Sequence, residues 1–344
     1  MFSSSQALKH WNIHASHAPS TDQGLINKTY IVSSIPKFVL QWVNPIFDPR
    51  IHLDLHLILK HLSQQGVTTP TLQLLPNGDT YLPDERGCWR IWTFIEGTTL
   101  HNIPHTSIAK AAGEIVGQFH RGLSTLDHKF VSNRRDIHNT PQRMNDLRSA
   151  LEIADGHPLE VPCRRLGEAI LNTWSQWEGT MDLPRRLTHG DLKISNILFN
   201  KKHDQGVALI DLDTIGYQSL ASEMGDAWRS WCNPAGEGKP DEASFDPEIF
   251  AASLYGWANA GPAITSLEKE NLVAGIERIC LELSARFCAD AINNTYFAED
   301  RNKYPQEGQH NLIRAQSQFN LGQSARKHKK RCEAIVNTTP LDIQ

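Results

Sequence analysis

The 344-residue chain carries 34 Lys or Arg against 38 Asp or Glu, a formal net charge of −4, so no global basic field suggests nucleic-acid binding. No apolar stretch approaches the roughly 20 residues of a membrane span, and the N-terminus lacks the basic and apolar segments of a secretory signal. Six scattered cysteines without a Cys-x-x-Cys pair favour a reduced, cytoplasmic protein, and the length suits one bilobal enzyme or two domains.

Residues 1–96 are predicted to form a β-rich lobe with one helix. The helix should open at Asp48 and run to about Gln65, because apolar residues recur there at helical spacing. Asn77-Gly78 is a strong hairpin-turn signal. Strands are expected where β-branched and aromatic residues gather, at 29–32, 37–43, 71–75, 80–82 and 88–95.

The segment around Gly24, just before the first of these strands, is a possible phosphate-covering turn. Backbone N–H groups in such a turn can approach phosphate oxygens, although a plain β-turn explains the residues equally well. On the next strand, Gln41 lies on the same face as Val39, so its side chain can point toward a cleft.

Residues 97–344 are predicted to be mainly helical, with one β-rich interruption near 187–213. The chain as a whole is therefore expected to be α+β, with a β-rich N-terminal lobe and a helical C-terminal lobe. Helices are expected near 108–123, 141–153, 160–179, 245–258, 266–290 and 308–330.

The β-rich interruption carries the most informative motif, Leu187-Thr-His-Gly-Asp-Leu-Lys-Ile-Ser-Asn-Ile-Leu-Phe199, followed by Ala208-Leu-Ile-Asp-Leu-Asp213. Phosphoryl transfer from ATP needs a carboxylate at the attacking hydroxyl and oxygen ligands for Mg²⁺. Asp191 fits the first role as the catalytic base, and Asn196 and Asp211 fit the second. The alternative is a surface hairpin with a solvated Asp and a capping Asn.

Three neighbouring residues have expected supporting roles. Lys193 can neutralise the transferring phosphoryl group, although it could also be a surface lysine. Asp213 would be a second metal contact if the chain stays extended after Asp211, or it caps the following turn. His189 is expected to brace the loop through backbone carbonyls around Asp211.

This loop resembles the catalytic loop of the aminoglycoside phosphotransferase and choline kinase superfamily, which shares the protein-kinase fold. Gly24-Leu-Ile-Asn27-Lys-Thr29-Tyr, the segment at Gln41 and Gly225-Asp226-Ala-Trp-Arg229 are most similar to its N-acetylhexosamine 1-kinase branch. The resemblance implies that Gly24, Asn27, Thr29 and Gln41 contact the nucleotide. It also implies that the backbone from Thr93 to Ile95 holds the adenine.

Two features depart from the kinase pattern. Where kinases carry a strand lysine paired with a helix glutamate, this chain has Gln41, and helix 48–65 contains no Glu. The missing cation is expected to be Lys193, with Lys28 and Arg90 as further candidates. Gly190 replaces the Arg of protein kinases, and no Ala-Pro-Glu follows Asp211, so a small molecule is the expected acceptor.

The acceptor is expected to bind past Asp211, where Asp226 and Arg229 are the main candidates and Arg314 a weaker one. Asp226 and Arg229 could equally form a helix pair at i, i+3. Trp228 and Trp231 suit the apolar face of a sugar, yet a place in the core is the better interpretation of both. The histidines at 52 and 56, and those at 10, 14 and 17, are interpreted as solvated or capping rather than as zinc ligands.

Together these features predict an ATP- and Mg²⁺-dependent kinase that phosphorylates a hydroxyl of a small molecule, with a sugar or amino sugar as the expected acceptor. One alternative is a kinase of choline, homoserine, a thiosugar or an aminoglycoside. Another is a non-catalytic nucleotide-binding regulator, suggested by the missing strand lysine. The sequence leaves the acceptor and the oligomeric state open.

Overall fold

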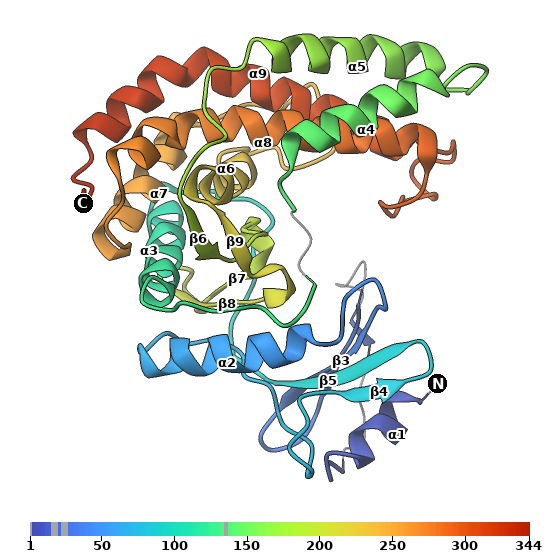
Figure 1. Cartoon of the computed structure of the whole chain (residues 1–344), viewed down its shortest axis with the longest axis vertical. Coiled ribbons are helices and arrows are strands. Elements are labelled where there is room, and N and C mark those ends of the chain that lie inside the picture. Colours follow the sequence, from blue (N-terminus) through green and yellow to red (C-terminus); the bar gives the residue numbers. More distant parts are fainter. Residues whose placement is uncertain (1, 15–19, 22–26, 134–136) are drawn as a thin grey trace.

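The computed structural model describes residues 2–14, 20–21, 27–133 and 137–344, and it has two lobes (Figure 1). A five-stranded sheet with helices α1 and α2 forms the smaller lobe, and the remaining helices gather in the larger one. The predicted α+β class, with a β-rich N-terminal part and a helical C-terminal part, is confirmed.

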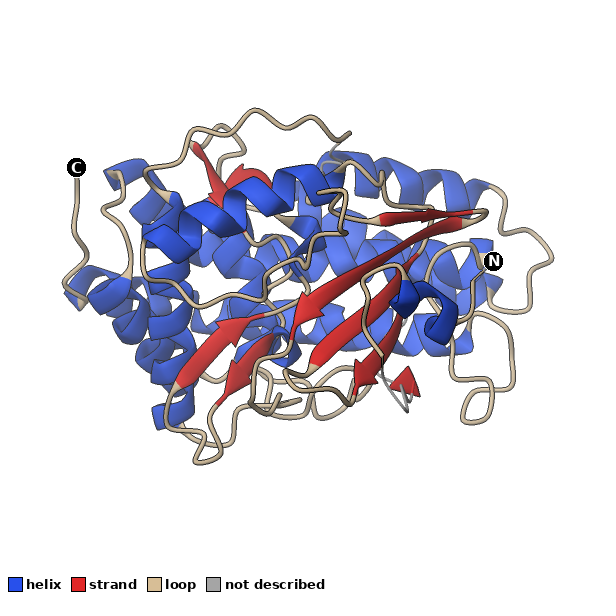
Figure 2. Cartoon of the chain, turned by 90° about the horizontal axis from the view of Figure 1, so that it is seen from below, coloured by secondary structure: helices blue, strands red, loops and turns tan. Residues whose placement is uncertain are grey.

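The N-terminal sheet is antiparallel throughout, with strand order β1-β2-β3-β5-β4. Its strands run in a single layer, seen from below in Figure 2. The central pair places Gln41 of β3 directly opposite Arg90 of β5. The strands are β1 (Ser20–Thr21), β2 (Lys28–Val32), β3 (Phe38–Val43), β4 (Leu82–Asp84) and β5 (Gly87–Thr93).

Alternation along β3 and β5 divides the sheet into two faces. Leu40 and Trp42 pack with Trp89 in a core that also contains residues of helix α1 (Ser4–Lys9). The opposite face carries Gln41 and its neighbours and lies toward helix α2 (Ile51–Gln64). Because side chains alternate along a strand, the sequence placed Gln41 on the correct face.

The expected strand at 71–75 is wrong as a regular strand. Leu72 forms only an isolated bridge to Trp92, and backbone bonds to β5 come from Thr71 and Gln73 alone. Pro70 and Pro76 flank the segment and carry no N–H, so the ladder cannot extend. The turn at Asn77-Gly78 is present, with Gly78 at a φ of +91° and its N–H donated to Leu75 O at 2.8 Å.

The C-terminal lobe contains the helices that the apolar periodicity predicts, with α8 and α9 longer than expected and α6 an addition. Helix α6 was missed although its apolar residues recur at helical spacing, and almost all of its residues are buried. The helices are α3 (Thr106–Leu123), α4 (Thr140–Glu152), α5 (Glu160–Ser175), α6 (Leu220–Trp231), α7 (Pro247–Ala260), α8 (Ser266–Asn293) and α9 (Gln309–Thr338).

Helices α3 and α7 pack closely because glycine removes side chains at their contact. A Cβ on Gly113 would lie 2.0 Å from the backbone oxygen of Ser253. The main core continues from these helices to α6 and α8, and also to α2, so the N-terminal helix belongs to the same apolar cluster. Among the described helices, none is long and apolar enough to cross a membrane.

Two small antiparallel sheets lie on the side of the larger lobe that faces the smaller one (Figure 1). The first pairs β6 (Arg185–Thr188) with β9 (Gly216–Ser219), and the second pairs β7 (Ile197–Phe199) with β8 (Gly206–Leu209). Short 3-10 turns at Ile194–Asn196 and Leu212–Thr214 connect these strands to the candidate site.

Candidate active site

The β7–β8 hairpin brings Asn196 and Asp211 to the same end, as predicted. Asn196 directly precedes β7, and its backbone oxygen accepts a hydrogen bond from Ile210 N at 2.9 Å. The Asp211 side chain remains 49 % exposed, so its carboxylate can meet a ligand. The two predicted metal ligands therefore come from adjacent backbone segments.

The chain does not stay extended after Asp211, which changes the role of Asp213. Asp211 adopts the left-handed conformation, with φ +63° and ψ +55°, and a 3-10 turn follows. Residues 211 and 213 consequently do not share a strand face, and Asp213 instead binds Arg90 and Asn27. These contacts with the smaller lobe were not predicted for Asp213.

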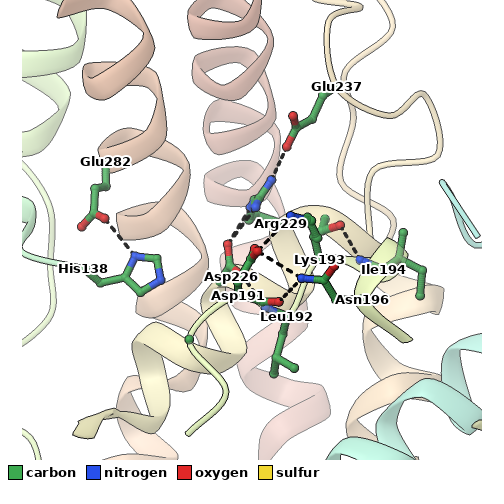
Figure 3. Close-up of polar contacts among 12 residues, drawn as sticks. His138, Asp191, Leu192, Lys193, Ile194, Asn196, Asp226, Arg229, Glu237 and Glu282 are labelled. Carbon is green, nitrogen blue, oxygen red and sulfur yellow. Dashed lines mark hydrogen bonds and ion pairs between the residues drawn. The ribbon is translucent and has the colours of Figure 1, made fainter. Parts of the chain in front are cut away.

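Asp191 lies at the centre of a short polar chain (Figure 3). Its Oδ2 accepts hydrogen bonds from Lys193 Nζ at 2.8 Å and from Asn196 Nδ2 at 3.0 Å. The same ammonium lies 3.9 Å from Asp211 Oδ2. Lys193 is thus placed between the predicted base and the predicted metal carboxylate.

The charges of this chain shift the pKa values of its members. Burial alone would raise the pKa of Asp191, but the Lys193 ammonium outweighs it, and the pKa is lowered. Burial would likewise lower the pKa of Lys193, but Asp191 and Asp211 raise it. Partial burial, with a further contribution from Asp191 and Asp213, raises the pKa of Asp211. Asp191 is therefore ionised near neutral pH.

The backbone of the His189–Asp191 segment is fixed by local geometry. His189 Nδ1 accepts from Asp191 N at 3.3 Å, so the proton is on Nε2, which donates to Ile210 O at 2.9 Å. This confirms that His189 braces a carbonyl next to Asp211. Gly190 has a φ of +85°, and a Cβ there would lie 2.5 Å from Thr214 O, so a side chain at this position would clash.

Side chains on one face of α6 accept hydrogen bonds from the backbone of the catalytic loop. Glu223 accepts from the N–H groups of His189 at 2.8 Å and Gly190 at 2.9 Å. Burial would raise the pKa of Glu223, but hydrogen bonds from His120 and the loop outweigh it and lower that pKa.

The same helix face continues along the loop. Asp226 Oδ2 accepts from Leu192 N at 2.9 Å, and Ser230 Oγ accepts from Ile194 N at 3.1 Å. Trp231 Nε1 donates to Leu192 O at 2.8 Å. Because residues 223, 226 and 230 follow helical spacing, one helix positions four backbone N–H groups between residues 189 and 194. This support was not predicted, although the polar spacing within a buried segment is its signal.

The expected acceptor role of Asp226 and Arg229 disagrees with their placement. Asp226 is 2 % exposed, and Arg229 Nε donates to its Oδ1 at 2.9 Å. Arg229 also binds Glu237 in the loop after α6 (Figure 3). The alternative of a helix pair is therefore the better description. Trp228 and Trp231 are fully buried, as the core interpretation predicts.

Arg314, the weaker acceptor candidate, lies on α9 and is partly exposed. Its Nη1 donates to Asn311 Oδ1 at 3.3 Å, and its guanidinium lies 5.3 Å from the centre of the Phe287 ring. Burial lowers the pKa of Arg314. Its side chain remains the more accessible of the two arginines.

On the N-terminal side, the predicted nucleotide residues are largely engaged with one another. Gln41 Nε2 donates to Thr29 Oγ1 at 3.0 Å, and Asn27 Nδ2 donates to Asp213 Oδ2 at 3.2 Å. Gln41 Oε1 accepts from Arg90 Nε at 2.9 Å. These side chains bond to one another, to Arg90 and to Asp213 rather than standing free for phosphate. Gly24 lies outside the described residues.

Not all of the backbone groups from Thr93 to Ile95 that were expected to hold adenine are free to do so. Thr93 N donates to Thr71 O at 2.9 Å, so this N–H is not free for adenine. The backbone groups of Ile95, in contrast, make no hydrogen bond to any residue in the described part of the chain. Ile95 is therefore the better hinge candidate of the two.

The oxygen donors present fit a hard divalent cation such as Mg²⁺. Asn196 uses Nδ2 for Asp191, which leaves its Oδ1 available, and the Asp211 carboxylate is half exposed. No cluster of three or more His, Cys, Asp or Glu suited to a metal occurs among the described residues. Mg²⁺ commonly binds one or two protein oxygens and completes its shell with water and phosphate. Asn196 and Asp211 would hold it here.

Two further buried histidines were not predicted as polar partners. His52 was interpreted as solvated or capping, but it is fully buried, with Nδ1 donating to Pro49 O at 2.6 Å. His138 Nδ1 lies 2.9 Å from Glu282 Oε1, and the ring faces the region of Asp226 and Asp191 (Figure 3). His138 and Glu282 are 144 positions apart, so no local pattern signals their pairing.

Comparison with known protein families agrees with this geometry. The model of the APH phosphotransferase enzyme family matches residues 21–262, a span that includes the N-terminal sheet, the catalytic loop and α6. The chain belongs to this family. A homoserine kinase of Gluconobacter oxydans (strain 621H) is 29 % identical over 120 residues, which cover 35 % of this chain and 34 % of that enzyme. The alignment thus spans about a third of that relative.

Several solved structures share the fold of this phosphotransferase family member along nearly its whole chain. An aminoglycoside phosphotransferase from Alicyclobacillus acidocaldarius has a TM-score of 0.63 at 15 % identity, covering 96 % of this chain and 97 % of its own. A microcompartment-associated aminopropanol kinase has a TM-score of 0.62 at 17 % identity, covering 95 % and 97 %. Amicoumacin kinase hAmiN, in complex with AMP-PNP, Ca²⁺ and Ami, has a TM-score of 0.60 at 13 % identity, covering 98 % of this chain and 93 % of its own.

Proposed function

We propose that this phosphotransferase family member transfers the γ-phosphoryl group of ATP to a hydroxyl of a small molecule. The observation that carries the proposal is the convergence of Asp191, Lys193, Asn196 and Asp211, whose polar atoms meet at one end of the β7–β8 hairpin. A protein that only binds nucleotide does not need a carboxylate such as Asp191 beside the two proposed metal ligands. Catalysis is therefore favoured over the alternative of a non-catalytic regulator.

In the proposed reaction the acceptor oxygen attacks the γ-phosphorus, the bond to the bridging oxygen breaks and ADP leaves. Asp191 orients the acceptor hydroxyl and receives its proton. Since Lys193 lowers the pKa of Asp191, the carboxylate is a weak base, and the proton moves late in a loose transition state. Bound Mg²⁺ would neutralise charge on the phosphates. Ile95 is proposed to contact the adenine.

For the acceptor we retain a sugar or amino sugar, on the strength of the sequence resemblance at Gly24–Tyr30 and Gly225–Arg229. A second candidate is a hydroxy amino acid, because the curated relative is a homoserine kinase. The accessible Arg314 suits a carboxylate as well as a sugar hydroxyl.

The test is a screen of purified protein with Mg·ATP for acceptor-dependent ADP release. The panel should contain sugars, amino sugars, hydroxy amino acids, choline and aminoglycosides, with product identity checked by mass spectrometry. The proposal predicts a phosphomonoester of at least one member. Tight Mg·ATP binding with no turnover on any acceptor would favour the regulator instead.

A further inference from the structure

Arg90 and Asp213 form a buried ion pair that joins the two lobes beside the candidate site. Nη1 of Arg90 lies 2.5 Å from Oδ1 of Asp213, and Nη2 lies 2.8 Å from Oδ2. Each side chain is only 2 % exposed. Two parallel hydrogen bonds between a guanidinium and a carboxylate also fix the relative orientation of both groups. The pair therefore sets the geometry between β5 and the turn after Asp211.

Other parts of the N-terminal lobe converge on the same pair. From β3, Gln41 Oε1 accepts from Arg90 Nε at 2.9 Å. From α2, His52 uses Nδ1 as a donor, so its Nε2 lone pair can accept from Arg90 Nη1 at 3.3 Å. Asn27, directly before β2, donates to Asp213. β3 and α2 thus contact the guanidinium of the pair, and Asn27 contacts its carboxylate.

Stability alone is a poor explanation for this arrangement. Removing two charges from water costs about as much as their attraction returns, and apolar residues can replace such a pair without loss. Asp211, two residues before Asp213, is held in the left-handed conformation, which residues with a side chain seldom adopt. An anchor on the far side of the turn can keep Asp211 in that conformation.

We propose that the Arg90–Asp213 pair positions Asp211 for metal-assisted nucleotide binding, and does so only when the N-terminal sheet is seated on the larger lobe. Arg90 and Asp213 are positioning residues, because their polar atoms are occupied by each other and by protein neighbours. The inference rests on the proposed function, since Asp211 is the proposed metal ligand.

The experiment compares Arg90→Met, Asp213→Leu, the double variant and Arg90→Lys in the full chain. AMP-PNP binding is titrated calorimetrically with and without Mg²⁺, and thermal unfolding is followed separately. Each single charge removal should lower the melting temperature, because it leaves its partner buried and uncompensated. The double variant should regain most of that loss, yet its Mg²⁺-dependent affinity should stay weakened by about 10- to 100-fold.

Arg90→Lys covers the case in which charge removal prevents folding. A lysine keeps the charge but cannot form both hydrogen bonds, so the variant should fold and still need more Mg²⁺ for half-maximal binding. Arg326→Met is the matched control, because Arg326 Nε binds Glu277 at 2.6 Å between α9 and α8. It should lower the melting temperature without changing the Mg²⁺ dependence.

The outcomes separate this inference from the proposed function. A double variant that regains both stability and wild-type Mg²⁺ dependence would overturn the positioning role and leave the function standing. Unchanged Mg²⁺ dependence in Arg90→Lys would do the same. If wild-type protein binds AMP-PNP equally with and without Mg²⁺, the proposed function fails and the inference fails with it.

Discussion

At the scale of single residues, the Lys193 ammonium reduces the repulsion between the Asp191 and Asp211 carboxylates. Its ammonium contacts Asp191 at 2.8 Å and lies 3.9 Å from Asp211. Two carboxylates this close to one cation repel each other less than they would alone. Lys193 is thus more than a surface lysine, although its role in transfer remains a prediction.

Replacing Lys193 by Met should lower kcat more than it raises the KM for ATP. The lysine gains interaction as negative charge spreads over the transferring group, and an interaction made only in the transition state appears in kcat. Since Lys193 lowers the pKa of Asp191, its loss should also move the acidic limb of the pH–rate profile to higher pH. Steady-state kinetics across pH measures both effects. A change in KM alone would show that Lys193 is not the missing cation.

Asp211→Ala should weaken nucleotide binding in the presence of Mg²⁺ and leave metal-free binding nearly unchanged. The half-exposed carboxylate can ligate a cation, and direct loss of a ligand should cost at least as much as the roughly 10- to 100-fold seen for outer-shell partners. Nucleotide titrations with and without Mg²⁺ measure the difference. Equal losses in both titrations would assign Asp211 a structural role.

At the scale of elements, α6 is the platform of the catalytic loop. Asp226 links that platform to Leu192 N, and it also neutralises Arg229. Asp226→Ala should leave the buried Arg229 with Glu237 alone, a loss of about 3–5 kcal/mol in the free energy of unfolding. It should also reduce kcat by about 10²-fold through misplacement of Asp191.

The acceptor KM distinguishes this role of Asp226 from direct acceptor binding. Misplacement of the loop should leave KM close to the wild-type value, whereas loss of an acceptor contact should raise it. Glu237→Gln serves as the control. It removes the half-exposed partner of Arg229 but spares the bond from Asp226 to the loop, so its effect should be small.

The pair of His138 before α4 and Glu282 in α8 gives the fold a pH dependence. Burial disfavours the charged imidazole, but the Glu282 carboxylate outweighs it and raises the pKa of His138 above its ordinary 6.5. Folding therefore gains stability from this histidine below about pH 6.5, where the unfolded chain is also protonated. The gain is lost as pH rises through the folded pKa.

Denaturant unfolding of wild type and His138→Gln at pH 6 and pH 9 tests this sign. The wild-type free energy of unfolding should fall more between the two pH values than that of the variant. Glu282 does not affect the comparison between pH 6 and pH 9. Its pKa is lowered despite burial, so its contribution to the free energy of unfolding is lost only in acid. A larger fall in the variant would refute the assignment.

At the scale of the whole molecule, several contacts fix the smaller lobe and the segment that follows it against the rest of the larger lobe. Thr98 and Phe199 exchange backbone hydrogen bonds of 2.9 and 2.8 Å, which tie the segment after the sheet to the catalytic hairpin. Asp54 of α2 accepts from Ser132 N at 3.0 Å, beyond α3. With the Arg90–Asp213 pair, these contacts hold the smaller lobe against the candidate site. The boundary after residue 96 remains our proposal.

The parts predictable from sequence are those encoded within a few residues. Alternation placed Gln41 on its face, helical periodicity located most helices, and the spacing from Asp191 to Asn196 and Asp211 located the site. These patterns are local, so tertiary contacts did not override them.

The missed parts depend on contacts between distant residues. The left-handed turn at Asp211 ended the alternation that would have put Asp213 beside it. The bond between Asp226 and Leu192 N joins residues 34 positions apart, so Asp226 was assigned to the acceptor rather than to the loop. The partnership of Arg90 with Asp213 spans 123 positions and has no local signature.

Acceptor-dependent turnover by Asp191→Asn, beside nucleotide binding by the same variant, tests the central claim most directly. The amide keeps the size of the carboxylate but cannot take a proton, so turnover should fall by about 10²–10⁴-fold. AMP-PNP affinity with Mg²⁺ should stay near the wild-type value. Turnover near the wild-type rate, with binding intact, would contradict the assignment of Asp191 as the base.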